Sequence, residues 1–405
     1  MNKLQTLKGF RDFLPAEALK RQYVINKIKD VFERFGFDPL ETPALERADV
    51  LLGKYGEEAD KLLYLFEDNG GRSVGLRYDQ TVPLARVLAN YPELPLPFKR
   101  YQIQPVWRAE NTQKGRYREF LQCDIDTVGT LSPLADAEII ECTLSAIQSL
   151  GLTDVSIRIN DRTIFDTLKL TSKEITILDK LDKIGKKGVL DELQAAGISD
   201  GNGLLDALAA AKPTEWLEKI FEVFKTQGLT EGKNIIFDPF LARGLDYYTS
   251  TIFEVQSEDT SSSLAGGGRY NDLIGKFSGR NLPAVGIAFG FDRILELLRD
   301  RQLLTNVEST TTILITIFSL QTVSASLATA TELRKAKINA EMYLDSEAKL
   351  DKQLKYADRK GIPYVIIQGP DELARGVVKL KNMQTKEQEE LTIEEVIQKL
   401  ISIRN

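Results

Sequence analysis

The stretch VWRAENTQKGRYREFLQCDID, residues 106–126, places two strand-like runs on either side of a polar, basic loop. Arg108 and Glu110 stand at one lip of the loop, and Arg116 and Tyr117 stand at the other. Arginine suits phosphate because its planar guanidinium donates two parallel hydrogen bonds and stays charged. The stretch therefore predicts two strands joined by a loop that can receive a phosphate-bearing ligand.

Polar residues alternate along the second of these strands. Gln122, Asp124 and Asp126 fall on one strand face, because successive side chains point to opposite faces. A charged hairpin in solvent is the ordinary alternative. The aromatic residues Trp107 and Phe120, interleaved with the charges, favour a pocket lining instead.

A glycine cluster and a second arginine follow in SLAGGGRYNDLIGKF (263–277) and LPAVGIAFGFDRILELL (282–298). Three consecutive glycines, from Gly266 to Gly268, allow a backbone to approach a ligand closely. Arg293 falls in the first turn of a predicted helix, where cations are disfavoured. It therefore implies a negatively charged partner, and pairing with Asp292 or another carboxylate is the ordinary alternative.

Two further junctions carry unexpected side chains. In LRYDQTVP (76–83), Asp79 and Thr81 stand where a strand gives way to a helix, and a helix cap explains both. In ARGLDYYTS (242–250), Arg243 and two tyrosines separate two apolar, strand-like runs. Turns are usually built from Gly, Asn or Pro, so this junction indicates a function.

Composition limits the protein's class. A chain of 405 residues predicts about two or three domains. The net charge of −6 argues against a wholesale polyanion binder but allows a local basic surface. No apolar run reaches the length of a membrane span, and the N-terminus lacks a signal-peptide core, so a cytoplasmic protein is expected. Cys123 and Cys142 are expected to be reduced thiols.

The chain contains no histidine. This removes the commonest general base and the commonest metal ligand, and with two cysteines it excludes conventional structural zinc. Catalysis must then use arginine, lysine, carboxylates, tyrosine, backbone dipoles or the substrate itself. Such a set suits transfer at a phosphate, where positioning and charge stabilisation matter most.

The patterns divide the chain into segments of different character. Strands and amphipathic helices fill 1–164 and 233–302, and Lys-rich, Gly-punctuated helical patterns fill 165–232. A polar linker is expected at 303–311, and strands alternating with helices over 312–405 predict an α/β domain.

Together these stretches resemble class II aminoacyl-tRNA synthetases, and specifically the histidyl-tRNA synthetase family. A helix followed by a strand ending at Pro43, the strand–loop–strand with Arg108, and the strand–helix with Arg293 resemble the three motifs of the class. ARGLDYYTSTIFEV and AGGGRYNDLIGKF are similar to segments specific to the histidyl family, and LKGFRDFLP and LRYDQTVPLAR add to the resemblance.

The resemblance implies an α/β protein with three parts: an α+β catalytic domain (1–164 and 233–302) with an antiparallel sheet and flanking helices, a helical insertion (165–232), and a C-terminal α/β anticodon-binding domain (312–405). It implies activation of L-histidine by ATP to histidyl-adenylate, and transfer of the histidyl group to the 3′ end of tRNA(His). ATP would enter with Mg²⁺ as substrate, and no bound cofactor, zinc or membrane is expected. A homodimer is implied.

The resemblance also assigns roles to residues. Arg108 and Arg243 would bind the α-phosphate, Arg293 the γ-phosphate end and adenine, and Glu110 the region of adenine. The histidine ammonium would meet Asp79, Thr81 and Gln122, and the imidazole would lie between Asp126 and Tyr248. Further pocket residues would be Arg116, Tyr117, Tyr247, Gly266 and Gly268. The tRNA acceptor end would meet Asn111, Gln113 and Lys114.

The main alternative is the regulatory paralogue that pairs with the ATP phosphoribosyltransferase of the histidine pathway. Such paralogues share the fold, typically lack the anticodon-binding domain and lose the motif arginines. Here residues 312–405 are present, and Arg108, Arg243 and Arg293 are all in place. These features favour the synthetase. A synthetase-like module without activity is a more distant alternative.

Overall fold

The computed structural model describes residues 4–52, 60–112, 115–226, 228–229, 232–243, 247–258, 260–304 and 308–404. The chain divides into two compact units. The first comprises Met1–Asp12 and Val24–Leu303, and the second comprises Phe13–Tyr23 and Leu304–Asn405. Within the described residues, no helix combines the length and the apolar character needed to cross a membrane.

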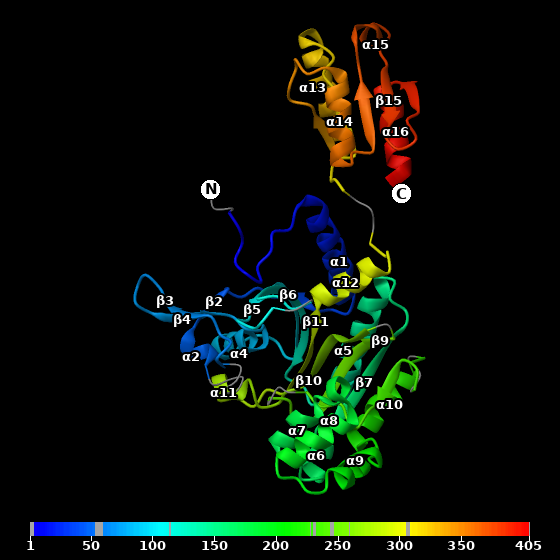
Figure 1. Cartoon of the computed structure of the whole chain (residues 1–405). Coiled ribbons are helices and arrows are strands. Elements are labelled where there is room, and N and C mark those ends of the chain that lie inside the picture. Colours follow the sequence, from blue (N-terminus) through cyan, green and yellow to red (C-terminus); the bar gives the residue numbers. More distant parts are fainter. Residues whose placement is uncertain are drawn as a thin grey trace. The chain divides into compact units, whose positions relative to one another are not determined.

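The described part of the first unit is built on an eight-stranded sheet (Figure 1). The strand order is β1-β5-β6-β11-β10-β9-β7-β8, and pairing is antiparallel from β5 to β7 and parallel at the two edges. The predicted strand–loop–strand at 106–126 is confirmed as β5 and β6. The strand bounds are β1 Asp38–Pro39, β5 Phe98–Trp107, β6 Glu119–Val128, β7 Val155–Asp161, β8 Ile235–Phe237, β9 Thr251–Ser257, β10 Thr260–Arg269 and β11 Ala284–Gly290.

Two long helices cover one face of this sheet. In α1 (Pro15–Arg34), the ring of Phe32 meets Phe289 of β11 edge-on at 5.4 Å. In α5 (Pro133–Ser149), the buried Asp136 pairs with the buried Arg269 of β10. The odd-numbered side chains of β10 and β11 therefore point towards these helices. The even-numbered side chains are left for the opposite face.

A small sheet, β2-β4-β3, is formed by the part of the chain between β1 and β5. β3 and β4 pair antiparallel and form a hairpin around the turn sequence EDNGGRS (67–73). The predicted helix near Thr81 is confirmed as α4. The bounds are β2 Leu45–Arg47, α2 Ala48–Leu51, β3 Leu65–Glu67, β4 Ser73–Leu76 and α4 Thr81–Asn90.

The predicted helical segment between β7 and β8 is confirmed. Figure 1 shows α6, α7, α8 and α9 grouped together, and their apolar side chains share a core with Leu84 of α4 and Tyr248. A capping box at Thr171 and Glu174 starts α7, satisfying backbone N–H groups at its first turn. The bounds are α6 Thr163–Thr167, α7 Ser172–Leu178, α8 Leu181–Ala195, α9 Gly201–Ala209 and α10 Glu215–Thr226. Two later helices of the unit are α11 Gly275–Ser278 and α12 Phe291–Asp300.

The second unit contains a five-stranded sheet in the order β13-β12-β14-β15-β16. Its strands alternate side chains into two separate apolar clusters: Ile313 and Ile315 enter one, and Leu314 and Val365 enter the other. The α/β prediction for this region is confirmed. The bounds are β12 Ile313–Ile315, η1 Leu320–Thr322, α13 Val323–Lys335, β13 Ala340–Met342, α14 Leu350–Lys360, β14 Tyr364–Ile367, α15 Pro370–Ala374, β15 Val378–Asn382, β16 Gln388–Leu391 and α16 Ile393–Arg404.

Candidate active site

Strand register brings two rows of side chains together on the open face of the large sheet. In antiparallel pairs, residues directly opposite each other point to the same face. One row reads Gln102, Asp124, Ala288, Gly266 and Glu254 across β5, β6, β11, β10 and β9. The neighbouring row reads Arg100, Asp126, Gly286, Gly268 and Ile252. Small residues in the middle of both rows leave room above the strands.

Neighbouring atoms lie so close to the glycines in these rows that a Cβ would not fit. A Cβ on Gly266 would lie 2.0 Å from Nη1 of Arg243, and a Cβ on Gly286 would lie 1.9 Å from Oδ1 of Asp126. Gly267 points to the other face, where a Cβ would meet the Gly286 carbonyl at 2.1 Å. The cluster therefore serves both the site and the packing of the sheet.

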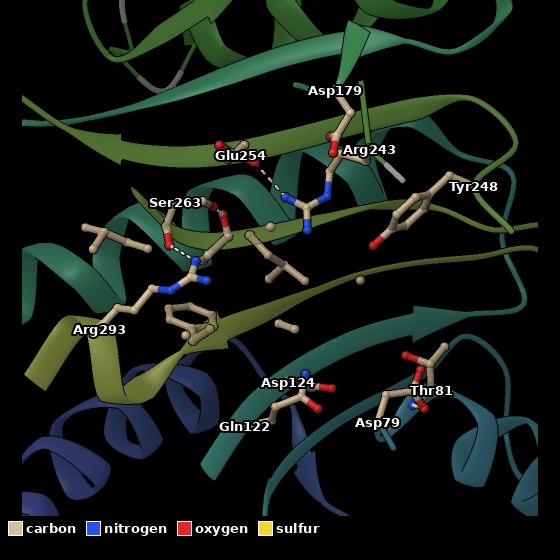
Figure 2. A pocket seen from close by; sticks show the side chains of 18 of the residues that line it. Asp79, Thr81, Gln122, Asp124, Asp179, Arg243, Tyr248, Glu254, Ser263 and Arg293 are labelled. Carbon is tan, nitrogen blue, oxygen red and sulfur yellow. Dashed lines mark hydrogen bonds and ion pairs between the residues drawn. The ribbon is translucent and has the colours of Figure 1, made fainter. Parts of the chain in front are cut away.

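A cavity of about 470 Å³ lies above this floor. Figure 2 shows Arg243 and Arg293 across the cavity from Asp79, Gln122 and Asp124. The other lining residues include these members of the predicted site: Thr81, Arg108, Glu110, Arg116, Tyr117, Asp126, Tyr247, Tyr248 and Gly266.

Arg108 is fixed at the mouth of the loop. Its backbone N–H donates to the Arg118 carbonyl at 2.9 Å, which closes the strand pair, and its Nε donates to the Tyr78 carbonyl at 3.2 Å. The guanidinium lies 4.3 Å from the centre of the Tyr78 ring and 5.1 Å from that of Phe120. The rings contact the flat faces of the guanidinium, so its N–H edge stays open for an anion.

Arg293 projects from the start of α12, where β11 ends. Its Nη1 donates to the Ser263 carbonyl at 2.8 Å, as Figure 2 shows. Its neighbour Asp292 accepts a hydrogen bond from Arg11 at 2.9 Å. Burial lowers the pKa of Arg293, and the nearby cations Arg116, Arg243 and Arg108 lower it further. This cluster of like charges predisposes the site to bind a polyanion.

Arg243 stands at the other side of the arginine cluster. Its Nη1 donates to Oε2 of Glu254 at 2.7 Å. Figure 2 also places Asp179, from the helical segment, close to Arg243. Burial raises the pKa of Asp179, and Lys183 and Arg243 oppose that rise. The insertion therefore supplies part of the cavity wall.

On the carboxylate side, Asp79 acts as the predicted cap. Its Oδ1 accepts the backbone N–H groups of Thr81 and Val82 at 3.1 Å each. These bonds satisfy the first turn of α4 and fix the carboxylate at the cavity wall. Asp79 therefore both caps α4 and lines the cavity.

Asp126 is held on both sides. Its Oδ2 lies 2.6 Å from Nη2 of Arg100, and its Oδ1 accepts from the Tyr270 hydroxyl. Both members of the ion pair are buried. Burial raises the pKa of Asp126, and Arg100 and the Tyr270 hydrogen bond act against that rise. The orientation of this carboxylate is therefore set before any ligand arrives.

Three tyrosines complete this side of the cavity. The rings of Tyr247 and Tyr248 lie 4.9 Å apart, and those of Tyr247 and Tyr270 lie 5.9 Å apart. Burial raises the pKa of all three phenols, so each remains a neutral donor or acceptor at neutral pH.

An N-terminal segment braces the loop and α12. The Gly9 carbonyl accepts from the backbone N–H groups of Arg118 and Glu119 at 3.0 and 3.3 Å. Arg11 stacks over the Tyr117 ring, 3.2 Å from its centre, and donates to Asp292. Two lining residues from distant parts of the chain are thereby connected through one side chain.

The predicted site and the observed site differ at several residues. Gln113 and Lys114, predicted for the tRNA acceptor end, lie outside the described residues, as do 244–246 of the RGLDYY segment. Asn111 is exposed on the loop. Arg100 and Tyr270 were missed. The alternation of Arg100 with Gln102 and Gln104 along β5 was a usable signal.

Comparisons with known proteins agree with this geometry. The sequence profile of the histidyl-tRNA synthetase family matches residues 9–196 and 169–294, and that of an anticodon-binding domain matches 314–403. A histidine–tRNA ligase of Cytophaga hutchinsonii is 41% identical over 455 aligned residues, covering 99% of this chain and 100% of the relative.

Solved structures give the same result for the fold. Histidyl-tRNA synthetase from Nostoc sp. PCC 7120 superposes with a TM-score of 0.84 at 30% identity, covering 98% of this chain and 100% of that one. An ATP phosphoribosyltransferase regulatory subunit/histidyl-tRNA synthetase from Bacillus halodurans gives 0.73 at 22% identity, covering 88% and 97% of the two chains, a likeness of fold alone. From the profile match and the full-length relatives, the chain belongs to the histidyl-tRNA synthetase family.

Proposed function

We propose that this chain activates L-histidine with MgATP to histidyl-adenylate and transfers the histidyl group to the 3′ end of tRNA(His). One observation carries the proposal: a single cavity holds a group of arginines facing a group of carboxylates. The arginines suit the phosphates of ATP, and the carboxylates suit the ammonium and ring N–H of histidine.

The proposed first step is an in-line displacement at the α-phosphorus. A carboxylate oxygen of histidine forms the new P–O bond, and the bond to pyrophosphate breaks. Arg108 and Arg243 would stabilise the charge that develops on the α-phosphate, and Arg293 would hold the γ-phosphate end. Mg²⁺ arrives with ATP and neutralises phosphate charge. The attacking carboxylate is already ionised, so no general base is needed.

In the second step, the terminal ribose hydroxyl of tRNA would attack the histidyl carbonyl, and AMP would leave. A phosphate oxygen of the adenylate can take the hydroxyl proton. The chain has no histidine to act as base, and this route does not require one. Asp126 and Tyr248 would contact the imidazole. The helix of Arg293, the loop of Glu110 and the backbone at Gly266 and Gly268 would enclose the nucleotide.

The second unit would bind the anticodon arm of tRNA, and the chain would act in the cytoplasm as a homodimer. Charge alone supports the tRNA role weakly, because several basic residues of the unit are already paired. Lys352 pairs with Asp345, Lys355 with Asp351, and Lys360 with Glu341. The homodimer is supported by exposed apolar side chains on the small sheet and just after α2, which a partner could cover: Leu45, Leu52, Leu65 and Phe66.

The deciding experiment is amino-acid-dependent ATP–pyrophosphate exchange, without tRNA, with each of the twenty amino acids. Exchange with histidine alone supports the proposal, and charging of tRNA(His) then tests the second step. No exchange from folded protein with magnesium present would contradict the proposal and favour a regulatory paralogue.

A further inference from the structure

A carboxylate stands inside the group of arginines in the cavity. Glu254 of β9 lies beside Arg243, and its Oε2 accepts the hydrogen bond from Nη1 of Arg243 at 2.7 Å (Figure 2). The side chains of Arg243 and Glu254 are 23% and 16% exposed. A carboxylate repels phosphate, so Glu254 lowers the attraction of this cavity for ATP. Its presence there indicates a compensating role.

The carboxylate of Glu254 is held in one orientation. Its Oε1 accepts a hydrogen bond from Nε2 of Gln256, two residues further along β9, at 3.3 Å. Arg158 lies directly opposite Glu254 on β7, but its guanidinium is bonded to two aspartates, Asp182 and Asp238. The other oxygen, Oε2, is thereby left for the arginine of the cavity.

Arg243 has a defined position between Glu254 and the floor of the cavity. Its Nη1, which donates to Glu254, lies so close to Gly266 that a Cβ there would approach to 2.0 Å. Gly266 and Glu254 are opposite each other in the register of β10 and β9, so both meet the same nitrogen. A guanidinium carries several N–H donors, and this bond uses one of them. The others are left for a phosphate.

Glu254 also acts on the charge of the arginine group. Burial and the neighbouring cations lower the pKa of Arg293, and Glu254 acts against that fall. Burial opposes the raised pKa of Arg243, and Tyr248 and Glu254 favour it. The carboxylate therefore offsets the mutual repulsion of guanidinium groups that would otherwise move apart before a phosphate arrives.

We propose that Glu254 is a positioning residue that holds Arg243 where the α-phosphate of ATP will lie. The inference rests on the proposed function, in which Arg243 stabilises the charge that develops on the α-phosphate. Asp179 of the insertion also acts on Arg243 through its charge, whereas Glu254 provides both a charge and a hydrogen bond. Loss of Glu254 should therefore impair the chemical step more than the binding of histidine.

The test is a double-mutant cycle on histidine-dependent activation in the intact protein. We expect Glu254→Ala to lower kcat for pyrophosphate exchange about 10- to 100-fold, the range for loss of a hydrogen bond to a charged group, with the KM for histidine within about twofold. In an Arg243→Ala background, Glu254→Ala should cause no further fall, because Glu254 then has no guanidinium to position. Single-turnover formation of histidyl-adenylate keeps the slow variants measurable.

Conservative variants separate positioning from folding. Glu254→Gln can still accept the hydrogen bond and should recover most of kcat. Glu254→Asp keeps the charge but withdraws the acceptor by one methylene, so it should lower kcat. Asp154→Ala is the matched control, since it breaks a partly exposed pair with Arg301. Neither of these two residues is among the described residues that line the cavity, and kcat should stay within about twofold.

The outcomes distinguish this inference from the proposed function. No fall in kcat for Glu254→Ala, or a fall by the same factor in the wild-type and Arg243→Ala backgrounds, would overturn the positioning role. An equal fall in Asp154→Ala would overturn it as well. Wild-type kcat in Arg243→Ala, or absence of histidine-dependent exchange in the wild type, would instead overturn the proposed function.

Discussion

Asp124 is a buried carboxylate in the floor of the cavity. Asp124 has no partner for Oδ1 among the described residues, whereas Asp126, on the same strand face, has two partners. A buried charge held without a partner lowers the stability of the folded protein. The ionised form of Asp124 is therefore expected to lower the stability of the ligand-free protein.

We predict that Asp124→Asn stabilises the ligand-free protein at pH 8. Burial raises the pKa of Asp124 in the folded protein above its value in the unfolded chain. The folded protein therefore loses stability as the pH rises from the unfolded-state pKa through the folded-state pKa. Asparagine has no charge to bury, and the expected gain is about 1–3 kcal/mol, the usual cost of an unsatisfied buried group. Thermal unfolding should show the gain shrinking towards pH 4, where both side chains are neutral. A gain of the same size at pH 4 and pH 8 would contradict the prediction.

Adjacent glycines of the cluster should respond differently to alanine. In Gly266→Ala the new Cβ meets the mobile end of Arg243, so the guanidinium must move and the fold can remain. We expect kcat for pyrophosphate exchange to fall about 100-fold or more, as when a preorganised donor is lost, with little change in melting temperature. In Gly267→Ala the Cβ meets backbone at the Gly286 carbonyl, so melting temperature should fall. Equal effects of the two variants on stability would contradict this assignment.

At the scale of elements, the site is assembled from segments that are distant in sequence. Arg11, in the N-terminal segment, pairs with Asp292 of α12, 281 residues later, and stacks on Tyr117 beside β6. Asp292 and Tyr117 both line the cavity, but Arg11 is not among the lining residues. The N-terminal segment therefore positions two walls of the cavity without lining it.

We predict that Arg11→Ala raises the KM for ATP about tenfold, from loss of one stacking contact and one partly exposed ion pair. The KM for histidine should change little, because the carboxylate side keeps its own contacts. Arg21→Ala is the matched control, since Arg21 stacks on Phe13 at 3.9 Å outside the cavity lining. Steady-state exchange kinetics would measure both constants, and an equal rise in the two would indicate a general structural role instead.

At the scale of the whole molecule, the two units have separate apolar cores. Leu84 belongs to the cluster that includes Tyr248, and Leu380 belongs to a cluster made only of residues after 312. Both leucines are buried. A substitution that destabilises one core is therefore expected to impair one step of the reaction, either activation or tRNA charging, before the other.

We predict that Leu380→Ala destabilises the second unit by about 2–5 kcal/mol, the usual cost of emptying a leucine site. Histidine-dependent pyrophosphate exchange should be unchanged, while charging of tRNA(His) at 37 °C should fall. Leu84→Ala is the matched change in the other core and should lower exchange as temperature rises. Loss of exchange in Leu380→Ala would contradict the proposed division of labour.

The sequence alone determined the local elements and most of the site's membership. The strand–loop–strand at 106–126, the cap at Asp79 and the strand that leads into Arg293 all follow from side-chain alternation and helix-end chemistry. These signals act over a few residues, so they survive without knowledge of the fold. The same alternation explains why Gln122, Asp124 and Asp126 share a face.

Only the tertiary structure decided what each side chain meets. Arg269 belongs to the same AGGGRY segment as Gly266, yet it points to the opposite face and pairs with Asp136 of α5. Arg100 reaches Asp126 because β5 and β6 pair in that register, and a shift of one residue would separate them. Pairing partners and register depend on contacts between distant segments. For that reason the division of the carboxylates into held Asp126 and open Asp124 could not be predicted from local sequence.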